Sequence, residues 1–127
     1  MAAWTWGTTF ANSIIDHMLR NQAYSPPATV YLSLHTADPG TTGASEVSGG
    51  SYARNAIALD AAASKATSNT DAESFTGMPA ATVTHVGLWT ASSAGTFIGG
   101  GALNASQAVP SGGTFTINAG DLDLALA

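Results

Sequence analysis

The chain has 127 residues, of which only 9% are charged, and its formal net charge at pH 7 is −5. This length predicts a single domain over residues 1–127 and excludes a multidomain enzyme. About a quarter of the residues of a typical soluble domain are charged, whereas the cations of this sequence are only Arg20, Arg54 and Lys65. We therefore predict a surface that neighbouring subunits cover.

Charge, cysteine content and hydropathy exclude several kinds of partner and site. Nucleic acids and anionic membranes bind clustered Lys and Arg, and the sequence has no such cluster. The absence of cysteine excludes disulfides, thiolate zinc sites and cysteine nucleophiles. No apolar run approaches the roughly 18 residues of a membrane span, and residues 1–7 lack the features of a signal peptide. We expect synthesis in the cytoplasm and neither a nucleic-acid nor a membrane partner.

The first predicted element is one amphipathic helix over residues 9–22. Its apolar residues recur at helical spacing, and they are Phe10, Ile14, Met18 and Leu19, with Ile15 beside them. Thr8 or Thr9 is expected to cap the start of the helix. Pro26 and Pro27 prevent its continuation.

The segment before this helix, residues 1–8, is predicted to be a short arm. It contains Trp4 and Trp6, and with Phe10 these rings would make an unfavourable exposed patch unless they pack against something. Two alternatives are open: the arm folds back on its own domain, or it docks on a neighbouring subunit, where tryptophan is a frequent anchor.

Alternating apolar and polar residues predict a β domain over residues 28–127. The candidate strands lie between turn-forming segments, at Val30–His35, Tyr52–Leu59, Thr82–Thr90, Thr96–Leu103, Thr114–Asn118 and Asp121–Leu126. Residues 82–90 are apolar on both faces, which predicts a central strand in a hairpin with residues 96–103. Residues 40–51 are predicted to be a long exposed loop, and residues 60–74 are compatible with helix, loop or edge strand. The predicted fold class is mainly β, a compact antiparallel β-sandwich or barrel preceded by one N-terminal amphipathic helix and a short arm.

Three consecutive glycines, Gly99 to Gly101, lie inside one of the predicted strands. Glycine within a strand marks a bulge, a bend, or the close approach of another backbone or a bulky ring. We predict that Trp89, across the hairpin, fills this space.

The titratable residues offer no recognisable catalytic motif. His17, His35 and His85 are present, but the sequence lacks the signatures of hydrolase nucleophile elbows, zinc proteases and nucleotide-binding loops. We interpret His17 as a surface or partner-facing residue, His35 as bonded to the turn at Asp38, and His85 as a hydrogen-bonded, partly buried residue. We predict no enzymatic activity, no cofactor and no metal site.

Two further charged features have structural interpretations. Asp121 and Asp123 share one strand face and are interpreted as a solvated edge rather than a calcium site. Arg54 is expected to have a defined carboxylate partner, inside the domain or across an interface. The candidate interface residues are therefore Trp4, Trp6, Phe10, His17, Arg20 and Arg54.

Three blocks of sequence resemble a family of small virion proteins of tailed phages, whose members are described as tail-fibre-like, minor tail or head-decoration proteins. The blocks are I-I-D-H-M-L-R-N-Q-A-Y-S-P-P-A-T-V-Y-L-S-L-H-T-A-D-P-G, E-V-S-G-G-S-Y-A-R and V-T-H-V-G-L-W-T-A. The resemblance extends from Ile14 to the C-terminal D-L-D-L-A-L and is weakest over residues 60–78. It implies a non-enzymatic structural protein of the virion that is assembled in the host cytoplasm.

The position in the virion is inferred from composition and size. A small domain with neutral surfaces and an aromatic arm favours a capsid decoration or cement protein, whose partners would be the major capsid protein and copies of itself, as a trimer. The alternatives are a tail fibre, minor tail or adaptor protein that binds other virion subunits, and a receptor- or carbohydrate-binding module. The last would present Trp89 or Tyr52 beside carboxylates in a shallow groove.

Overall fold

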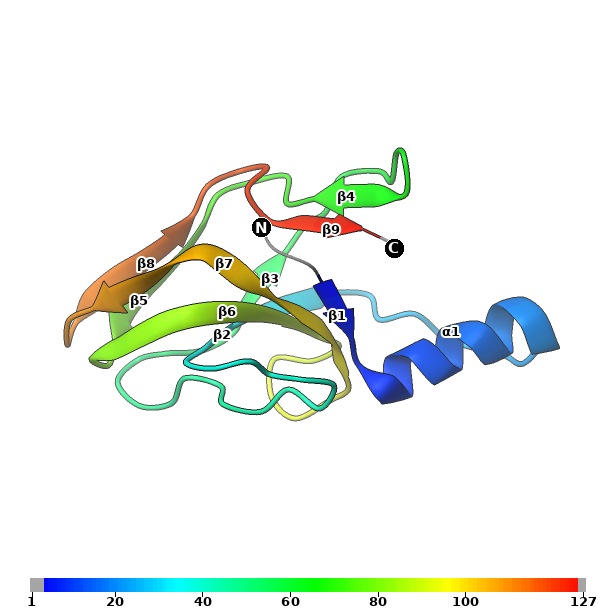
Figure 1. The fold of residues 1–127 in the computed structure, drawn as a ribbon, viewed down its shortest axis with the longest axis horizontal. Coiled ribbons are helices and arrows are strands. Elements are labelled where there is room, and N and C mark those ends of the chain that lie inside the picture. Colours follow the sequence, from blue (N-terminus) through cyan, green and yellow to red (C-terminus); the bar gives the residue numbers. More distant parts are fainter. Residues whose placement is uncertain (1–3, 126–127) are drawn as a thin grey trace.

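The architecture is a sandwich-like arrangement of antiparallel sheets from which one helix extends (Figure 1). A computed structural model describes residues 4–125. Its elements are β1 (Trp4–Trp6), α1 (Thr8–Arg20), β2 (Val30–His35), β3 (Asn55–Ile57), β4 (Ala66–Ser68), β5 (Glu73–Met78), β6 (Ala81–Trp89), β7 (Phe97–Val109), β8 (Gly113–Ile117) and β9 (Asp123–Ala125). Five strands form the main sheet in the order β1-β7-β6-β2-β3, and the pairs β4-β9 and β5-β8 form two small sheets. The predicted fold class, mainly β with one helix near the N-terminus, is confirmed.

The centre of the main sheet is the predicted hairpin of β6 and β7. These strands pair antiparallel from Ala81 opposite Val109 to Trp89 opposite Phe97, and β2 pairs with the other edge of β6. In β2, every residue from Leu32 to His35 is completely buried. Burial on both faces explains why apolar or hydrogen-bonded side chains are needed at each of these positions.

The hydrophobic core lies between the main sheet and the two small sheets. Its members from the small sheets and the segment before β9 are buried apolar side chains, namely Phe75, Met78, Phe115, Ile117, Leu122 and Leu124. Full burial of one such side chain stabilises the fold by roughly 1.5–3 kcal/mol. Leu122 and Leu124 alternate with the exposed Asp121 and Asp123, as the sequence predicted for this strand.

The segments with weak sequence signals form short strands. Residues 60–74, for which helix, loop and edge strand were open, contain β4 and the start of β5. The strand predicted over residues 52–59 is shortened to β3, and Arg54 lies just before it. The side chains of Tyr52 and Arg54 form hydrogen bonds within the loop, and these bonds keep residues 52–54 out of the strand pairing.

Residues 4–6 of the predicted arm form β1, so this part packs on its own domain. Trp4 pairs with Gly101 and Trp6 with Gly99 on the edge of β7. A Cβ atom at Gly99 would collide with the indole nitrogen of Trp4 and lie 2.8 Å from the carbonyl oxygen of Thr5. The space above this glycine is therefore filled by Trp4, and the prediction that Trp89 fills it was wrong.

The helix was predicted over residues 9–22 and is observed at Thr8–Arg20, so it ends two residues earlier than expected and has a different N-cap. Gly7 occupies the N-cap position without a side-chain hydrogen bond, so neither Thr8 nor Thr9 caps the helix. At the other end Asn21 adopts a left-handed conformation with φ 56°, which ends the helix before the two prolines. Asparagine tolerates this conformation better than other side chains except glycine.

Helix α1 projects from the body of the molecule (Figure 1), and none of its residues is buried. Phe10, near its start, is half-buried against the core, and Ile14 is also half-buried. Further along, Ile15, Met18 and Leu19 are 52%, 68% and 79% exposed. The apolar stripe predicted from the sequence is therefore only partly covered by the domain itself. Among residues 4–125, no helix is long and apolar enough to cross a membrane.

Candidate interaction surface

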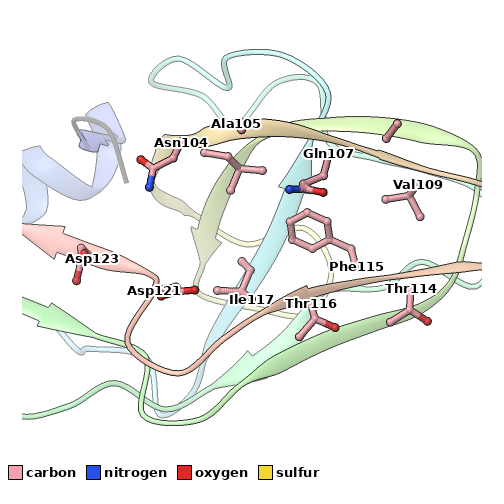
Figure 2. A pocket seen from close by; sticks show the side chains of 12 residues that line it. Asn104, Ala105, Gln107, Val109, Thr114, Phe115, Thr116, Ile117, Asp121 and Asp123 are labelled. Atoms are coloured by element: carbon pink, nitrogen blue, oxygen red, sulfur yellow. The ribbon is translucent and has the colours of Figure 1, made fainter.

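A polar groove of about 490 Å³ lies between β7 and β8. Figure 2 shows Asn104 and Gln107 along β7, with Asp121 and Asp123 at the end of the groove. Both aspartates are exposed, as the solvated-edge interpretation expected. Within the part of the chain that the structure describes, no three His, Asp or Glu residues are grouped so as to hold a metal ion.

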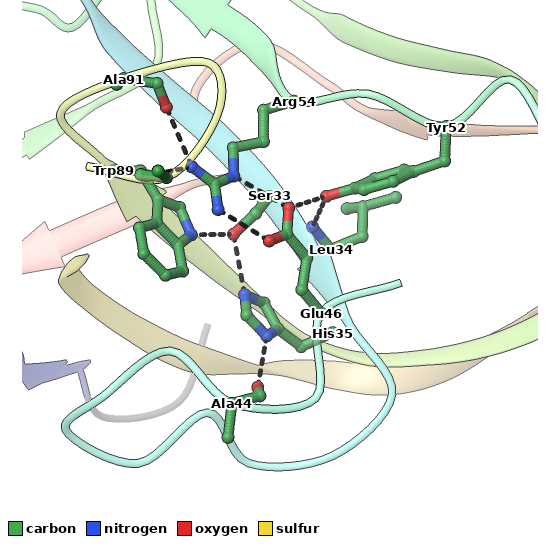
Figure 3. Close-up of polar contacts among 10 residues, drawn as sticks. Ser33, Leu34, His35, Ala44, Glu46, Tyr52, Arg54, Trp89 and Ala91 are labelled. Carbon is green, nitrogen blue, oxygen red and sulfur yellow. Dashed lines mark hydrogen bonds and ion pairs between the residues drawn. The ribbon is translucent and has the colours of Figure 1, made fainter. Parts of the chain in front are cut away.

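A largely buried ion pair, Arg54 with Glu46, anchors the long loop between β2 and β3 (Figure 3). The guanidinium donates from Nη2 to Oε1 at 2.8 Å and from Nε to Oε2 at 2.9 Å, a bidentate pair. Its Nη1 donates to the carbonyl oxygens of Ala91 and Ala94, and Arg54 lies 3.8 Å from the centre of the Trp89 ring. Only 8% of the Arg54 side chain is exposed. Of the two alternatives for its partner, the structure shows the one inside the domain.

Tyr52 links this ion pair to β2. Its hydroxyl donates to Oε2 of Glu46 at 2.8 Å and accepts a hydrogen bond from the backbone N–H of Leu34 at 3.0 Å. Burial raises the pKa of Tyr52 well above its usual value, so it remains protonated and donates. Burial alone would raise the pKa of Glu46, but hydrogen bonds from Arg54 and Tyr52 outweigh it and hold that pKa below its usual value.

His35 and Ser33 form a second buried hydrogen-bonded group beside the ion pair (Figure 3). His35 Nδ1 donates to the carbonyl oxygen of Ala44 at 2.7 Å, which leaves Nε2 to accept from the Ser33 hydroxyl, also at 2.7 Å. That hydroxyl in turn accepts from Nε1 of Trp89 at 3.0 Å. Burial lowers the pKa of His35 and keeps the ring neutral. The prediction that His35 bonds the Asp38 turn was wrong, since Asp38 accepts from Gly40 instead.

The chemistry of the Ser33–His35 pair is structural. A serine beside a histidine is the arrangement of a nucleophile and its base, but both residues are completely buried. The group that orients the ring is a backbone carbonyl, which does not stabilise an imidazolium as a carboxylate does. The pair instead joins the loop at Ala44 to β2 and to the Trp89 ring.

An apolar groove of about 470 Å³ lies between α1, the segment after it and the pair β4-β9. One wall is aromatic: Trp6 stacks on Phe10 with ring centroids 5.6 Å apart, and Phe10 meets Tyr24 edge-on at 6.3 Å. The opposite wall contains small or aliphatic residues, among them Leu59, Ala62, Ala66 and Leu124, with Lys65 at the same wall. Most of the surface that lines this groove is apolar.

The candidate interface residues are distributed over four places. Trp6 and Phe10 line the apolar groove, and Trp4 packs on Gly99, where its buried indole N–H has no acceptor within residues 4–125. His17 and Arg20 lie on the projecting part of α1, where Arg20 pairs with Asp16 at 2.9 Å. Arg54 belongs to the buried network. The structure thus brings Trp6 and Phe10 together and separates Arg54 from the rest.

The other predicted residues have ordinary structural roles. His17 is exposed and donates from Nδ1 to the carbonyl oxygen of Gln22 at 2.9 Å. His85 is half-buried and hydrogen-bonded to Thr84, which confirms its interpretation. Sequence reasoning recognised the apolar stripe of α1 but did not identify its second half as exposed. The far wall of the groove was missed because Ala62 and Ala66 carry no distinctive sequence signal.

Comparison with known proteins identifies the family. A family model described as Gp80, podophage GP4 fiber I protein gp80, matches residues 5–125. A search of curated proteins found no significant match. The matched range includes the helix, both grooves and the buried network, and it confirms the resemblance to tailed-phage virion proteins. The chain therefore belongs to the family of podophage GP4 fiber I protein gp80 and is a structural protein of the virion.

Proposed function

We propose that the protein is a non-enzymatic subunit of the fibre apparatus of its phage, assembled in the host cytoplasm and held in the virion by contacts with copies of itself and other virion subunits. The observation that carries this proposal is the family match over residues 5–125, whose description is that of a fibre protein. The exposed apolar residues of α1 support assembly as the mode of action, because such a surface is stable in water only when another surface covers it.

The absence of an enzymatic role is part of the proposal. The only serine–histidine pair joined by a hydrogen bond in residues 4–125 is Ser33–His35, and no substrate reaches a pair that is completely buried. Neither Tyr52 nor Trp89 is arranged as a carbohydrate platform. Tyr52 stacks on Phe75 with centroids 6.0 Å apart, and the Trp89 ring lies under Arg54 and against Phe97.

Location and copy number in the virion test the proposal. We expect that a cryo-EM map of the virion, with the chain identified by fitting the projecting helix, places it in the fibres or tail at a few to some dozens of copies. Quantitative mass spectrometry of purified virions checks the copy number independently. The capsid decoration role, with the major capsid protein as partner and trimers on the head, predicts hundreds of copies, and that result would overturn the fibre assignment.

A further inference from the structure

We propose that the exposed apolar face of α1 in one copy docks into the apolar groove of a second copy. In this arrangement Ile15, Met18 and Leu19 occupy the groove between α1 and β4-β9 of the neighbour. The inference rests on the proposed function in one respect, that the chain acts by assembly, and it names a partner surface for that assembly.

The first observation is that the end of α1 exposes apolar side chains that a partner surface would cover. Its three largest exposed apolar side chains lie within five consecutive residues, and the body of the domain does not reach them. Isolated helices of about this length are marginal in water and gain most of their stability from packing of an apolar face. The projecting half of α1 has such an apolar face, formed by Ile15, Met18 and Leu19, but the described residues of its own domain leave that face exposed.

The second step is that the groove matches this face in size. Its volume is about 470 Å³, roughly three times the cavity of about 150 Å³ that holds a benzene-sized group. Three side chains of the size of isoleucine, methionine and leucine therefore fill it. Its far wall is lined by Ala62 and Ala66, and such small residues let a helix approach closely.

The third step is charge. Asp16 and Arg20 cancel within α1, so the formal charge of −5 belongs to the rest of the chain. Two copies that meet through α1 therefore avoid the repulsion between their acidic bodies. Any contact between body and body would bring like charges together.

A charge at the groove also complements the helix. Lys65 is exposed and lies at the groove beside β4. Asp16 is next to Ile15 in α1, in the same part of the helix as Met18 and Leu19. In the docked arrangement the carboxylate of Asp16 meets the neighbour's Lys65, because opposite charges across an interface help to set its register.

The contact is heterologous, since one copy contributes the helix and the other the groove. The second copy keeps its own helix free for a third, so the contact repeats until a ring closes or a filament forms. A two-fold contact of helix against helix would use one surface only and end at a dimer. This difference gives the experiment.

The test mixes two defective variants. M18D with L19D removes the helix face, and A62E with A66E fills and charges the groove. We expect the unmodified protein to form oligomers in analytical ultracentrifugation, each double variant to be monomeric, and an equimolar mixture to form one-to-one heterodimers. Circular dichroism of each variant checks that it is folded. A mixture of folded variants that stays monomeric, or an unmodified protein that stays monomeric at every concentration, would overturn the inference.

A milder pair of variants keeps the test independent of folding, because Lys65 is exposed and 43% of the Asp16 side chain is exposed. D16K and K65E are each expected to weaken self-association on the order of tenfold, and the combined variant to restore most of it. If the combined variant is as weak as the single ones, Asp16 and Lys65 do not meet and the proposed docking is overturned. If the mixed variants form heterodimers but the protein is located on the phage head, the fibre assignment is overturned and the docking inference is not.

Discussion

The buried network around Arg54 and the projecting helix α1 each contain an arginine–carboxylate ion pair, but the two pairs have different roles. Arg54 is 8% exposed and bonds Glu46 through two nitrogen atoms, and its third nitrogen donates to two carbonyl oxygens. Arg20 is 64% exposed and makes one contact with Asp16. In the network each nitrogen of the guanidinium has a hydrogen-bond partner inside the domain. On α1 the polar contact is exposed to water, and the apolar side chains of the helix end are exposed as well. The difference separates a region that serves the fold from one that serves assembly.

The largest expected effect comes from breaking the buried pair. R54A leaves the half-buried carboxylate of Glu46 without its cation, and we expect the free energy of unfolding to fall by about 3–5 kcal/mol. The matched control is R20A, which removes an exposed pair and should lower it by about 0.5 kcal/mol or less. Urea denaturation of both variants measures the difference. Equal losses would show that the network does not stabilise the fold more than the surface pair does.

The next effect concerns the attachment of β1. G99A adds a Cβ atom that collides with Trp4 and approaches the Thr5 carbonyl oxygen to 2.8 Å, so β1 must shift from β7, at a loss of about 1–3 kcal/mol. In the background of W4A the same substitution should be milder, because the ring that it meets is gone. Thermal denaturation of the two single variants and the double variant gives the coupling. Purely additive losses would contradict the contact between Trp4 and Gly99.

A smaller effect is a loss of stability in mild acid. The pKa of His35 in the folded protein lies below the ordinary 6.5 because the ring is buried, so the unfolded chain binds a proton first as the pH falls. Stability from this residue is complete above pH 6.5 and declines as the pH drops through the interval between the two pKa values. Glu46, whose folded pKa lies below 4.5, adds a decline below that value.

This pH effect is measured by NMR titration and by denaturation at several pH values. The titratable and charged groups that face the ring are Glu46, Arg54 and His85. We expect His35 to titrate below its ordinary 6.5, and H35N to flatten the dependence of stability on pH between about 7 and 5. A His35 that titrates at or above 6.5 would be inconsistent with the buried neutral ring.

The smallest effect is expected on α1. Replacing Met18 and Leu19 with serine should change the free energy of unfolding by about 0.5 kcal/mol or less, since surface substitutions rarely do more and neither side chain is buried. The contrasting variant is L122A in the core, with an expected loss of about 2–5 kcal/mol. Both are compared by denaturation at a protein concentration low enough to keep the chain monomeric. A large loss from the serine variant would mean that the helix end packs on its own domain.

The sequence predicted the elements whose pattern is local. Alternation within Val30–His35 and Ala81–Trp89 indicated β2 and β6, and the short turn after Trp89 indicated the hairpin with β7. The position of β4 was not predicted, because residues 60–74 contain no large apolar side chain. Strand β5 contains Phe75 and Met78 but was also not predicted, since it pairs with β8, which is distant in the chain. Glu46 lies in the predicted loop over residues 40–51, and it was not identified as the partner of Arg54 because that pairing depends on how the loop folds back.

By itself, the sequence determined the fold class, the apolar stripe of α1, the expectation of a carboxylate partner for Arg54 and the virion family. These follow from periodicity, from the scarcity of cations and from blocks of residues that lie together in the chain. Only the tertiary structure decided that Trp4 rather than Trp89 covers Gly99, that the partner of Arg54 is Glu46, and that Met18 and Leu19 are exposed while Phe10 is half-buried. The reason is physical. The spacing of apolar residues indicates that one face of the helix is apolar, but the part of that face that the domain covers depends on where the body of the sheet ends.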